Sequence, residues 1–194
     1  MTGADELGRT LAVIARSFEA LGVRWAVGGS IASAAHGEPR ATNDVDVIAT
    51  LSIDQARALV EGLHETFYAD QAAAEEAVRR RTSFNLIDQA TFIKVDVFVP
   101  APGPLGSGQL DRVRVVDIVP GAPPLPILGP EDVVLQKLRW FQMGGEVSDR
   151  QWRDILSVLR LSAGALDKAY LASTAENAGL GELLERALRD ASEA

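Results

Sequence analysis

The hydrophobic positions of the first fifty residues follow first a helical and then a strand-like spacing. Apolar residues recur every three or four positions over 7–21, which predicts an amphipathic helix. The short apolar run 23–27 predicts a strand that ends at Gly28-Gly29. Small residues over 30–35 suit a short helix, and alternation over 44–49 predicts a second strand. The chain therefore opens with a mixed pattern of helices and strands.

The middle of the chain adds two helices and a hairpin. Ser52 and Gln55 have the spacing of a capping box and begin a helical pattern. Alanine and charged residues over 71–81 predict another helix. The strand-like runs 84–87 and 92–99 are separated by a short polar linker, which predicts an antiparallel hairpin.

A stretch rich in proline and glycine, residues 119–130, marks a boundary in the chain. Before it, residues 113–118 are a further strand candidate. After it the periodicity is helical, and a proline followed by two acids is a typical helix start. The predicted C-terminal helices begin at residues 130 and 149 and then cover 166–177 and 180–190.

These patterns together predict an α/β (α+β) fold in two parts. Residues 1–128 are expected to form a small mixed sheet flanked by helices. Residues 129–194 are expected to form a C-terminal helical subdomain. A chain of 194 residues is long enough for one compact core with such an appendage.

Composition narrows the kind of protein. No apolar run approaches about 18 residues and no signal-peptide pattern opens the chain, so neither a membrane span nor export is expected. Cysteine is absent, which excludes disulfides and thiolate sites and fits a cytoplasmic protein. The formal net charge is -8, whereas proteins that hold a nucleic-acid backbone usually present a basic face. Charge therefore does not favour a nucleic-acid partner, although a local basic cleft would allow one.

Two aspartates interrupt the second predicted strand. Because successive strand side chains point to opposite faces, Asp44 and Asp46 share one face while Val45 and Val47 point into the core. Ionised carboxylates at this spacing repel each other, and a divalent cation such as Mg²⁺ or Mn²⁺ would offset that repulsion. Asp96, in a later strand, is a candidate third ligand. Three such carboxylates could hold two metal ions for phosphoryl displacement.

A double-glycine turn precedes the acids. Gly28-Gly29-Ser30 lies between a predicted strand and a predicted helix, where glycine lets the backbone approach a ligand closely. The first helix amides and the Ser30 hydroxyl would face an anion, so the turn is a candidate phosphate site. Each feature also has a plainer interpretation. The glycine turn could be an ordinary turn, and the aspartate pair could be the polar face of an edge strand. Asp96 could form a surface salt bridge with Lys94.

The ordered set resembles the signature of the DNA polymerase beta-like nucleotidyltransferase superfamily. In that superfamily a glycine turn opens a helix, an Asp-x-Asp pair follows, and a third acid lies on a later strand. The finer pattern is similar to the AbiEii-like branch, which includes toxins of toxin–antitoxin systems. The residues that carry this likeness are Gly28, Gly29, Ser30, His36, Gly37, Arg40, Thr42, Asp44 and Asp46.

The resemblance implies an enzyme that transfers a nucleoside monophosphate from a nucleoside triphosphate to a hydroxyl. The acceptor could be a protein, a transfer-RNA end or a small molecule, and an antitoxin could be a partner. Asp44, Asp46 and Asp96 would be the catalytic acids and the ligands of Mg²⁺ (or Mn²⁺), with Asp96 as a possible base. Ser30 and the amides of the glycine turn would hold the outer phosphates.

Three further residues are candidates for the nucleotide site. Lys137 is flanked at helical spacing by valines and aromatic residues, so it either reaches water past an apolar surface or contacts an anion such as a phosphate. Asp154 matches the position of an aspartate in the AbiEii-like branch, and its alternative is a surface position. Thr42 is expected near the acid pair, where a loop-to-sheet hydrogen bond is an equal alternative.

Asp96 separates the two leading hypotheses for function. If Asp96 faces the same cleft as Asp44 and Asp46, a catalytic enzyme is favoured. If Asp96 faces solvent beside Lys94, the hypothesis of a non-catalytic nucleotide-binding or regulatory module of the same fold is favoured. A purely structural domain would leave the aspartate pair, the glycine turn and Lys137 unexplained.

Overall fold

The computed structural model describes residues 3–39, 41–42, 44–117 and 119–193. Its helices are α1 (Gly3–Ala20), α2 (Gly29–His36), α3 (Ile53–Leu63), α4 (Gln71–Arg80), the 3₁₀ helix η1 (Ser107–Asp111), α5 (Pro130–Met143), α6 (Asp149–Leu161), α7 (Lys168–Asn177) and α8 (Gly181–Glu193). Its strands are β1 (Arg24–Val27), β2 (Asp44–Thr50), β3 (Phe67–Tyr68), β4 (Ser83–Asp88), β5 (Lys94–Phe98), β6 (Arg114–Val116) and β7 (Leu125–Ile127).

Within the described residues the strands form one seven-stranded mixed sheet, in the order β3-β4-β5-β2-β1-β7-β6. Central β2 pairs antiparallel with β1 and parallel with β5. The predicted hairpin is present as the antiparallel pair β4 and β5. β7 runs parallel to β1 and antiparallel to β6. The mixed sheet flanked by helices that the sequence predicts is confirmed.

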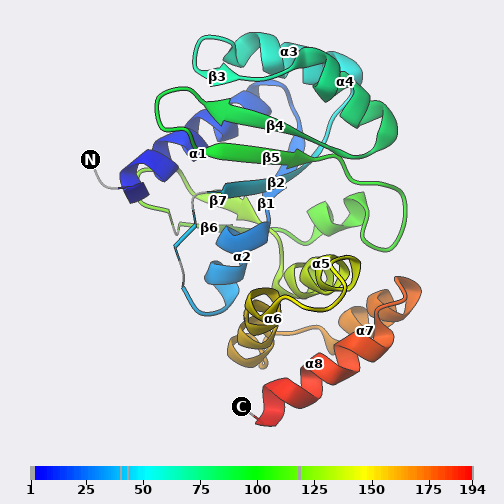
Figure 1. Ribbon diagram of the computed structural model, residues 1–194. Helices are drawn as coiled ribbons and strands as arrows, with labels where there is room; N and C mark the ends of the chain where they lie inside the picture. The colour runs from blue at the N-terminus through cyan, green and yellow to red at the C-terminus, as the bar shows by residue number, and fades with distance from the viewer. Residues whose placement is uncertain (1–2, 40, 43, 118, 194) are drawn as a thin grey trace.

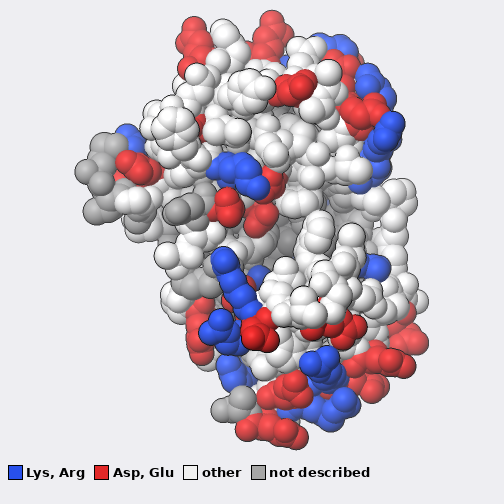
Figure 2. All heavy atoms as spheres, in the orientation of Figure 1, with Lys and Arg blue, Asp and Glu red and all other residues white. Residues whose placement is uncertain are grey.

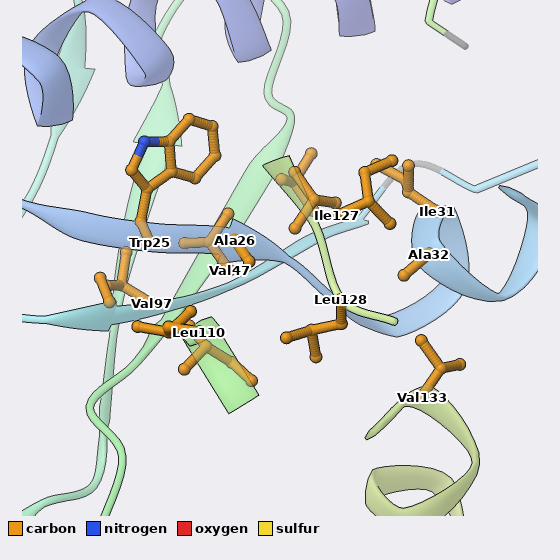
Figure 3. Close-up of a cluster of buried hydrophobic side chains, with 14 of the residues drawn as sticks. Trp25, Ala26, Ile31, Ala32, Val47, Val97, Leu110, Ile127, Leu128 and Val133 are labelled. Atoms are coloured by element: carbon orange, nitrogen blue, oxygen red, sulfur yellow. The ribbon is translucent and has the colours of Figure 1, made fainter. Parts of the chain in front are cut away.

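Alternation along β2 fixes which face is core. Val45, Val47 and Ala49 are fully buried, whereas Asp44 is exposed and Asp46 is half-buried. Figure 3 shows buried side chains from β1, α2, β2, β5, β7 and the start of α5 gathered into one cluster. Each such apolar side chain contributes about 1.5–3 kcal/mol when it leaves water. This core holds β2 rigidly beneath its polar face.

The four C-terminal helices lie together at the bottom of Figure 1, below the sheet. α5 begins at Pro130, which occupies the first helical turn as predicted. α5 packs against α2, α6 and α7, and α8 packs against α6 and α7. The short helix α2 contacts β2 as well as α5 and α6, so it connects the sheet to the C-terminal helices. The division into parts at residues 128 and 129 stays a prediction.

Several element boundaries differ from the sequence-based expectation. The stretch 119–130, interpreted only as a boundary, contains the strand β7, which tolerates Pro126 because it is three residues long and ladder bonds are few. Phe92, expected in a strand, has a φ of 59° and belongs to the turn before β5. The two-residue strand β3 is too short to give a pattern. The end of the candidate strand 113–118 lies outside the described residues.

Candidate active site

The three predicted acids lie on one face of neighbouring strands. Asp46 of β2 is the register partner of Asp96 of β5, and Asp44 is the partner of Lys94. Burial raises the pKa of the Asp46 carboxyl, and the negative charges of Asp96 and Asp44 raise it further, while Lys137 and Lys94 oppose the rise. The acids therefore form a site where negative charge is concentrated and a cation would be stabilised.

The glycine turn stands directly against this acid cluster. The backbone N–H of Gly28 donates to the carbonyl oxygen of Asp46 at 2.8 Å. Gly29 begins α2 with a φ of 52°, a left-handed conformation that favours glycine. A β-carbon at Gly29 would lie 1.8 Å from Oδ2 of Asp46, so no other residue fits there without displacing the carboxylate. The N-terminus of α2 and the acid thus share one wall.

A pocket of about 470 Å³ opens over this wall. Figure 2 shows the corresponding face hollowed between the sheet and the C-terminal helices, with charged side chains at its edge. Its lining mixes polar and charged side chains with apolar and aromatic ones. The lining residues are Gly28, Gly29, Ser30, Asp46, Ile48, Phe98, Leu128, Val133, Gln136, Lys137, Trp140, Ser148, Arg150, Gln151 and Asp154. A pocket of this size and mixed character suits a nucleotide-sized ligand.

Lys137 and Asp154 form an ion pair across the C-terminal wall of the pocket. Nζ of Lys137 on α5 lies 2.8 Å from Oδ2 of Asp154 on α6, and the two side chains are only 11% and 13% exposed. Of the two alternatives for Lys137, the one in which its amine reaches water past an apolar surface is wrong, because the amine contacts a carboxylate inside the protein. The alternative of a surface position for Asp154 is likewise wrong.

Three predicted residues stand outside the pocket lining. Oγ1 of Thr42 accepts from the Asp44 N–H at 3.3 Å and donates to the Asp44 carbonyl at 3.2 Å, as the loop-to-sheet alternative expects. Oδ2 of Asp96 pairs with Nζ of Lys94 at 2.8 Å, although the Asp96 side chain is only 16% exposed. Asp44 is exposed at the edge of β2. Arg40, part of the family pattern, lies outside the described residues.

The sequence of the chain matches a known protein family over nearly its whole length. The family described as "Nucleotidyl transferase AbiEii toxin, Type IV TA system" matches residues 12–193. The chain belongs to the AbiEii nucleotidyltransferase family. No curated protein sequence matches the chain significantly.

Solved structures agree with the fold of this AbiEii-family protein. An antigenic nucleotidyltransferase-like protein from Paracoccidioides brasiliensis is 17% identical with a TM-score of 0.56, over 95% of this chain and 93% of its own. The antibiotic-resistance factor ANT(2'')-Ia is 15% identical with a TM-score of 0.55, over 92% and 97% of the two chains. The lincosamide antibiotic adenylyltransferase LnuA, lincomycin-bound, is 13% identical with a TM-score of 0.50, over 77% and 94%.

Several pocket residues of the AbiEii-family protein were not predicted from sequence. Phe98 follows Asp96 on the same strand face, and Trp140 follows Lys137 by one helical turn, so spacing could have indicated both. Their rings meet edge-on with centroids 5.8 Å apart. The backbone N–H of Gln151 donates to Oγ of the cap residue Ser148 at 3.3 Å, while its buried side-chain Oε1 has no hydrogen-bond partner among the described residues. No described helix of the AbiEii-family protein is long and apolar enough to span a membrane.

Proposed function

We propose that the protein is a metal-dependent nucleotidyltransferase that moves a nucleoside monophosphate from a nucleoside triphosphate to a hydroxyl acceptor. Family and fold establish the class of transferase. The observation that carries the specific proposal is the contact of Gly29 with Asp46, because the candidate phosphate turn and the candidate metal ligand line the same pocket.

The acids provide the donor set that a hard divalent cation needs. Asp44, Asp46 and Asp96 share a strand face, and the raised pKa of Asp46 reflects burial and crowded negative charge that Mg²⁺ or Mn²⁺ would offset. Among the described residues no three side chains already stand in a metal-binding group, and Lys94 must leave Oδ2 of Asp96 before that oxygen can bind a cation. When bound, the cation supplies charge neutralisation at the phosphates.

The reaction that fits this wall is an in-line displacement at the α-phosphorus. The acceptor hydroxyl oxygen forms the new P–O bond, the bond between the α-phosphorus and its bridging oxygen breaks, and pyrophosphate leaves. Asp96 takes the hydroxyl proton. Ser30 and the amides at the start of α2 bind the outer phosphates, and Lys137 donates to a phosphate oxygen in exchange for the Asp154 carboxylate.

The wider role follows the family. As a member of a toxin family of type IV toxin–antitoxin systems, the protein would act with an antitoxin as partner. The acceptor would be a protein, an RNA end or a small hydroxylated molecule such as an antibiotic. The absence of cysteine fits action in the cytoplasm.

A second candidate function is a nucleotide-binding module without catalysis. The observation that favours it is the ion pair of Lys94 with Asp96, together with the position of Asp96 outside the pocket lining. In this case Asp46 and the glycine turn would still bind a triphosphate with a cation, but no group would take the acceptor proton.

Thermal unfolding with Mg²⁺ and each of the four ribonucleoside triphosphates tests the proposal. We expect at least one triphosphate to raise the melting temperature, and we expect Asp46→Asn to remove that gain because Asp46 lines the pocket. Asp54→Asn, an exposed change on α3, is the matched control and should keep the gain. Absence of any shift at millimolar triphosphate, with Mg²⁺ or Mn²⁺, would disprove nucleotide binding.

Transfer itself requires a second measurement. Incubation with triphosphate labelled at the α-phosphate should move label onto a protein, an RNA or a small hydroxylated molecule, with pyrophosphate released. Binding without transfer to any of the three classes would leave the non-catalytic module as the correct function.

A further inference from the structure

A second, smaller pocket opens beside the nucleotide pocket. It has a volume of about 280 Å³ and is formed by α2, the loop after α2, and α6. Arg150 and Asp154 line both pockets, so the two spaces adjoin at these side chains. The remaining lining residues are Ser33, Glu38, Pro39, Arg153 and Ser157. A molecule bound here would lie next to the nucleotide.

Two arginines and two carboxylates line this pocket, and each carboxylate also has a cationic partner from outside the lining. Asp154 pairs with Lys137 at 2.8 Å, and Glu38 lies 4.0 Å from Arg160. In the part of the chain that the structure describes, neither Arg150 nor Arg153 has a carboxylate within 4.0 Å. Figure 2 shows basic side chains beside the hollow, in the region of α2 and α6. This pair of arginines contrasts with a chain whose net charge is -8.

Arg150 stands where a helix disfavours it, because it lies in the first turn of α6, at the positive end of the dipole, where an acid such as Asp149 is favourable. Its charge therefore adds to the positive potential of the helix end. Arg153 follows one turn later, and its Nε donates to the carbonyl oxygen of Asp149 at 3.4 Å. Such an arrangement attracts an anion, and guanidinium groups bind phosphate oxygens through two parallel hydrogen bonds.

The opposite wall of this pocket is held in place before any ligand binds. Oγ of buried Ser157 accepts the N–H of Glu38 at 2.6 Å, which ties the loop after α2 to α6. Oγ of Ser162 donates to the carbonyl of His36 at 3.1 Å, and Nε2 of His36 lies 2.7 Å from the carbonyl oxygen of Leu128. A fixed wall lowers the entropy cost of binding.

We propose that this second pocket binds a phosphate group of the acceptor substrate, so that the acceptor of the reaction is a phosphate-bearing molecule with a free hydroxyl. The inference rests on the proposed function and specifies its acceptor. Arg153 and Arg150 hold the acceptor phosphate, and the acceptor hydroxyl extends past Asp154 toward the α-phosphorus of the nucleotide. An RNA end and a phosphorylated sugar share this chemistry, and neutral hydroxylated molecules lack it.

The test uses the full chain with triphosphate labelled at the α-phosphate and three acceptor probes. The probes are a short single-stranded RNA with a free 3′ hydroxyl, a sugar phosphate, and the same sugar without phosphate. We expect label on the RNA or on the sugar phosphate, and not on the bare sugar. Arg153→Gln should raise KM for the labelled acceptor by about tenfold with little change in kcat, because the arginine holds a group remote from the reacting atoms.

Arg153 is the better test position because Arg150 also lines the nucleotide pocket. Arg189→Gln on α8 removes one exposed arginine away from both pockets and should leave KM unchanged. For the RNA probe, binding should also lose salt dependence in Arg153→Gln, with a log–log slope smaller by about 0.7.

The outcomes separate the two levels of inference. Label on the RNA alone or on the sugar phosphate alone supports the phosphate site and names the source of the phosphate. Equal labelling of the bare sugar, label only on protein, an unchanged KM in Arg153→Gln, or nucleotide binding with neither phosphate probe labelled would each overturn it. If no triphosphate stabilises the wild-type protein, the proposed function itself is rejected, and the phosphate-site proposal falls with it.

Discussion

Gly29 and Asp46 are in contact at the start of the candidate site: a β-carbon on Gly29 would collide with the Asp46 carboxylate, because it would lie 1.8 Å from Oδ2. The glycine is therefore required twice, once for its left-handed backbone and once for the absence of a side chain. The antiparallel pairing of β1 with β2 brings Asp46 back beside the turn that ends β1.

Substitution of Gly29 tests this contact. We expect Gly29→Ala to destabilise the fold by about 1–3 kcal/mol through backbone strain, and to abolish stabilisation by Mg²⁺ and triphosphate because the Asp46 carboxylate must move. Urea unfolding and thermal shift measure the two effects. Gly62→Ala is the matched control, because open space surrounds Gly62 within helix α3; it should stabilise the fold by about 1 kcal/mol and keep the ligand shift.

The buried ion pair between Lys137 and Asp154 should show strong coupling. Removing one partner leaves the other charge with little access to water, so Lys137→Met or Asp154→Leu should each cost roughly 1–3 kcal/mol of unfolding free energy. The double variant should cost less than the two single costs added together. Urea unfolding of the four proteins gives this coupling, and strictly additive costs would contradict a direct pair.

The pairing of Lys94 with Asp96 gives a test of the acid's role. If Asp96 is the third metal ligand, Lys94→Met should increase Mg²⁺ affinity in the presence of triphosphate, because a competing cation 2.8 Å from Oδ2 is removed. Asp96→Asn should lower transfer by about a hundredfold or more while triphosphate binding persists. Both effects can be measured by titration of Mg²⁺ and by label transfer. Full transfer activity in Asp96→Asn would show that another group receives the proton.

Asp132 should give the fold a pH dependence. Its carboxyl is fully buried at the start of α5 and accepts a hydrogen bond from Tyr170 at 2.7 Å, and burial raises its pKa to about 6 from 3.8. The folded state holds this proton more tightly than the unfolded chain, so protonated Asp132 adds to the free energy of unfolding, and this addition is complete below about pH 4. The addition is lost as pH rises through about 6, which lowers the free energy of unfolding by about 3 kcal/mol.

Urea unfolding at about pH 4, 5, 6 and 7 checks this expectation. Relative to Asp132→Asn, which keeps an acceptor for Tyr170 and cannot ionise, the wild type should lose stability across that range. A difference between the two proteins that stays constant with pH would show that Asp132 does not titrate there.

The parts of the fold with strong local patterns could be predicted from the sequence. The capping box of Ser52 and Gln55 forms both of its hydrogen bonds, and Gly22 follows α1 in the left-handed conformation. Alternation along β2 placed Asp44 and Asp46 on one face correctly. β7 was missed because it has only three residues with Pro126 at its centre. Its parallel partner β1 also lies far away in the sequence, so no local pattern indicates that pairing.

In the candidate site, too, the sequence could not predict contacts that depend on how distant elements pack. Sequence order indicated the glycine turn, the aspartates and Lys137, but it could not show that Lys137 faces Asp154, because the pair depends on how α5 packs against α6. Arg150 and Arg153 carried no signal either, since exposed arginines on an amphipathic helix are common. Only the structure shows that both arginines line a pocket.

The larger pocket takes Gly28, Ser30 and Asp46 from the first half of the chain and Lys137 and Asp154 from the second. Whatever fills it will therefore bridge the sheet and the C-terminal helices and act as a cross-link between them. Occupancy and the attachment of these helices to the core are thermodynamically linked. A fragment that ends before α5 would retain the acid pair but lack the pocket residues that α5 and α6 contribute.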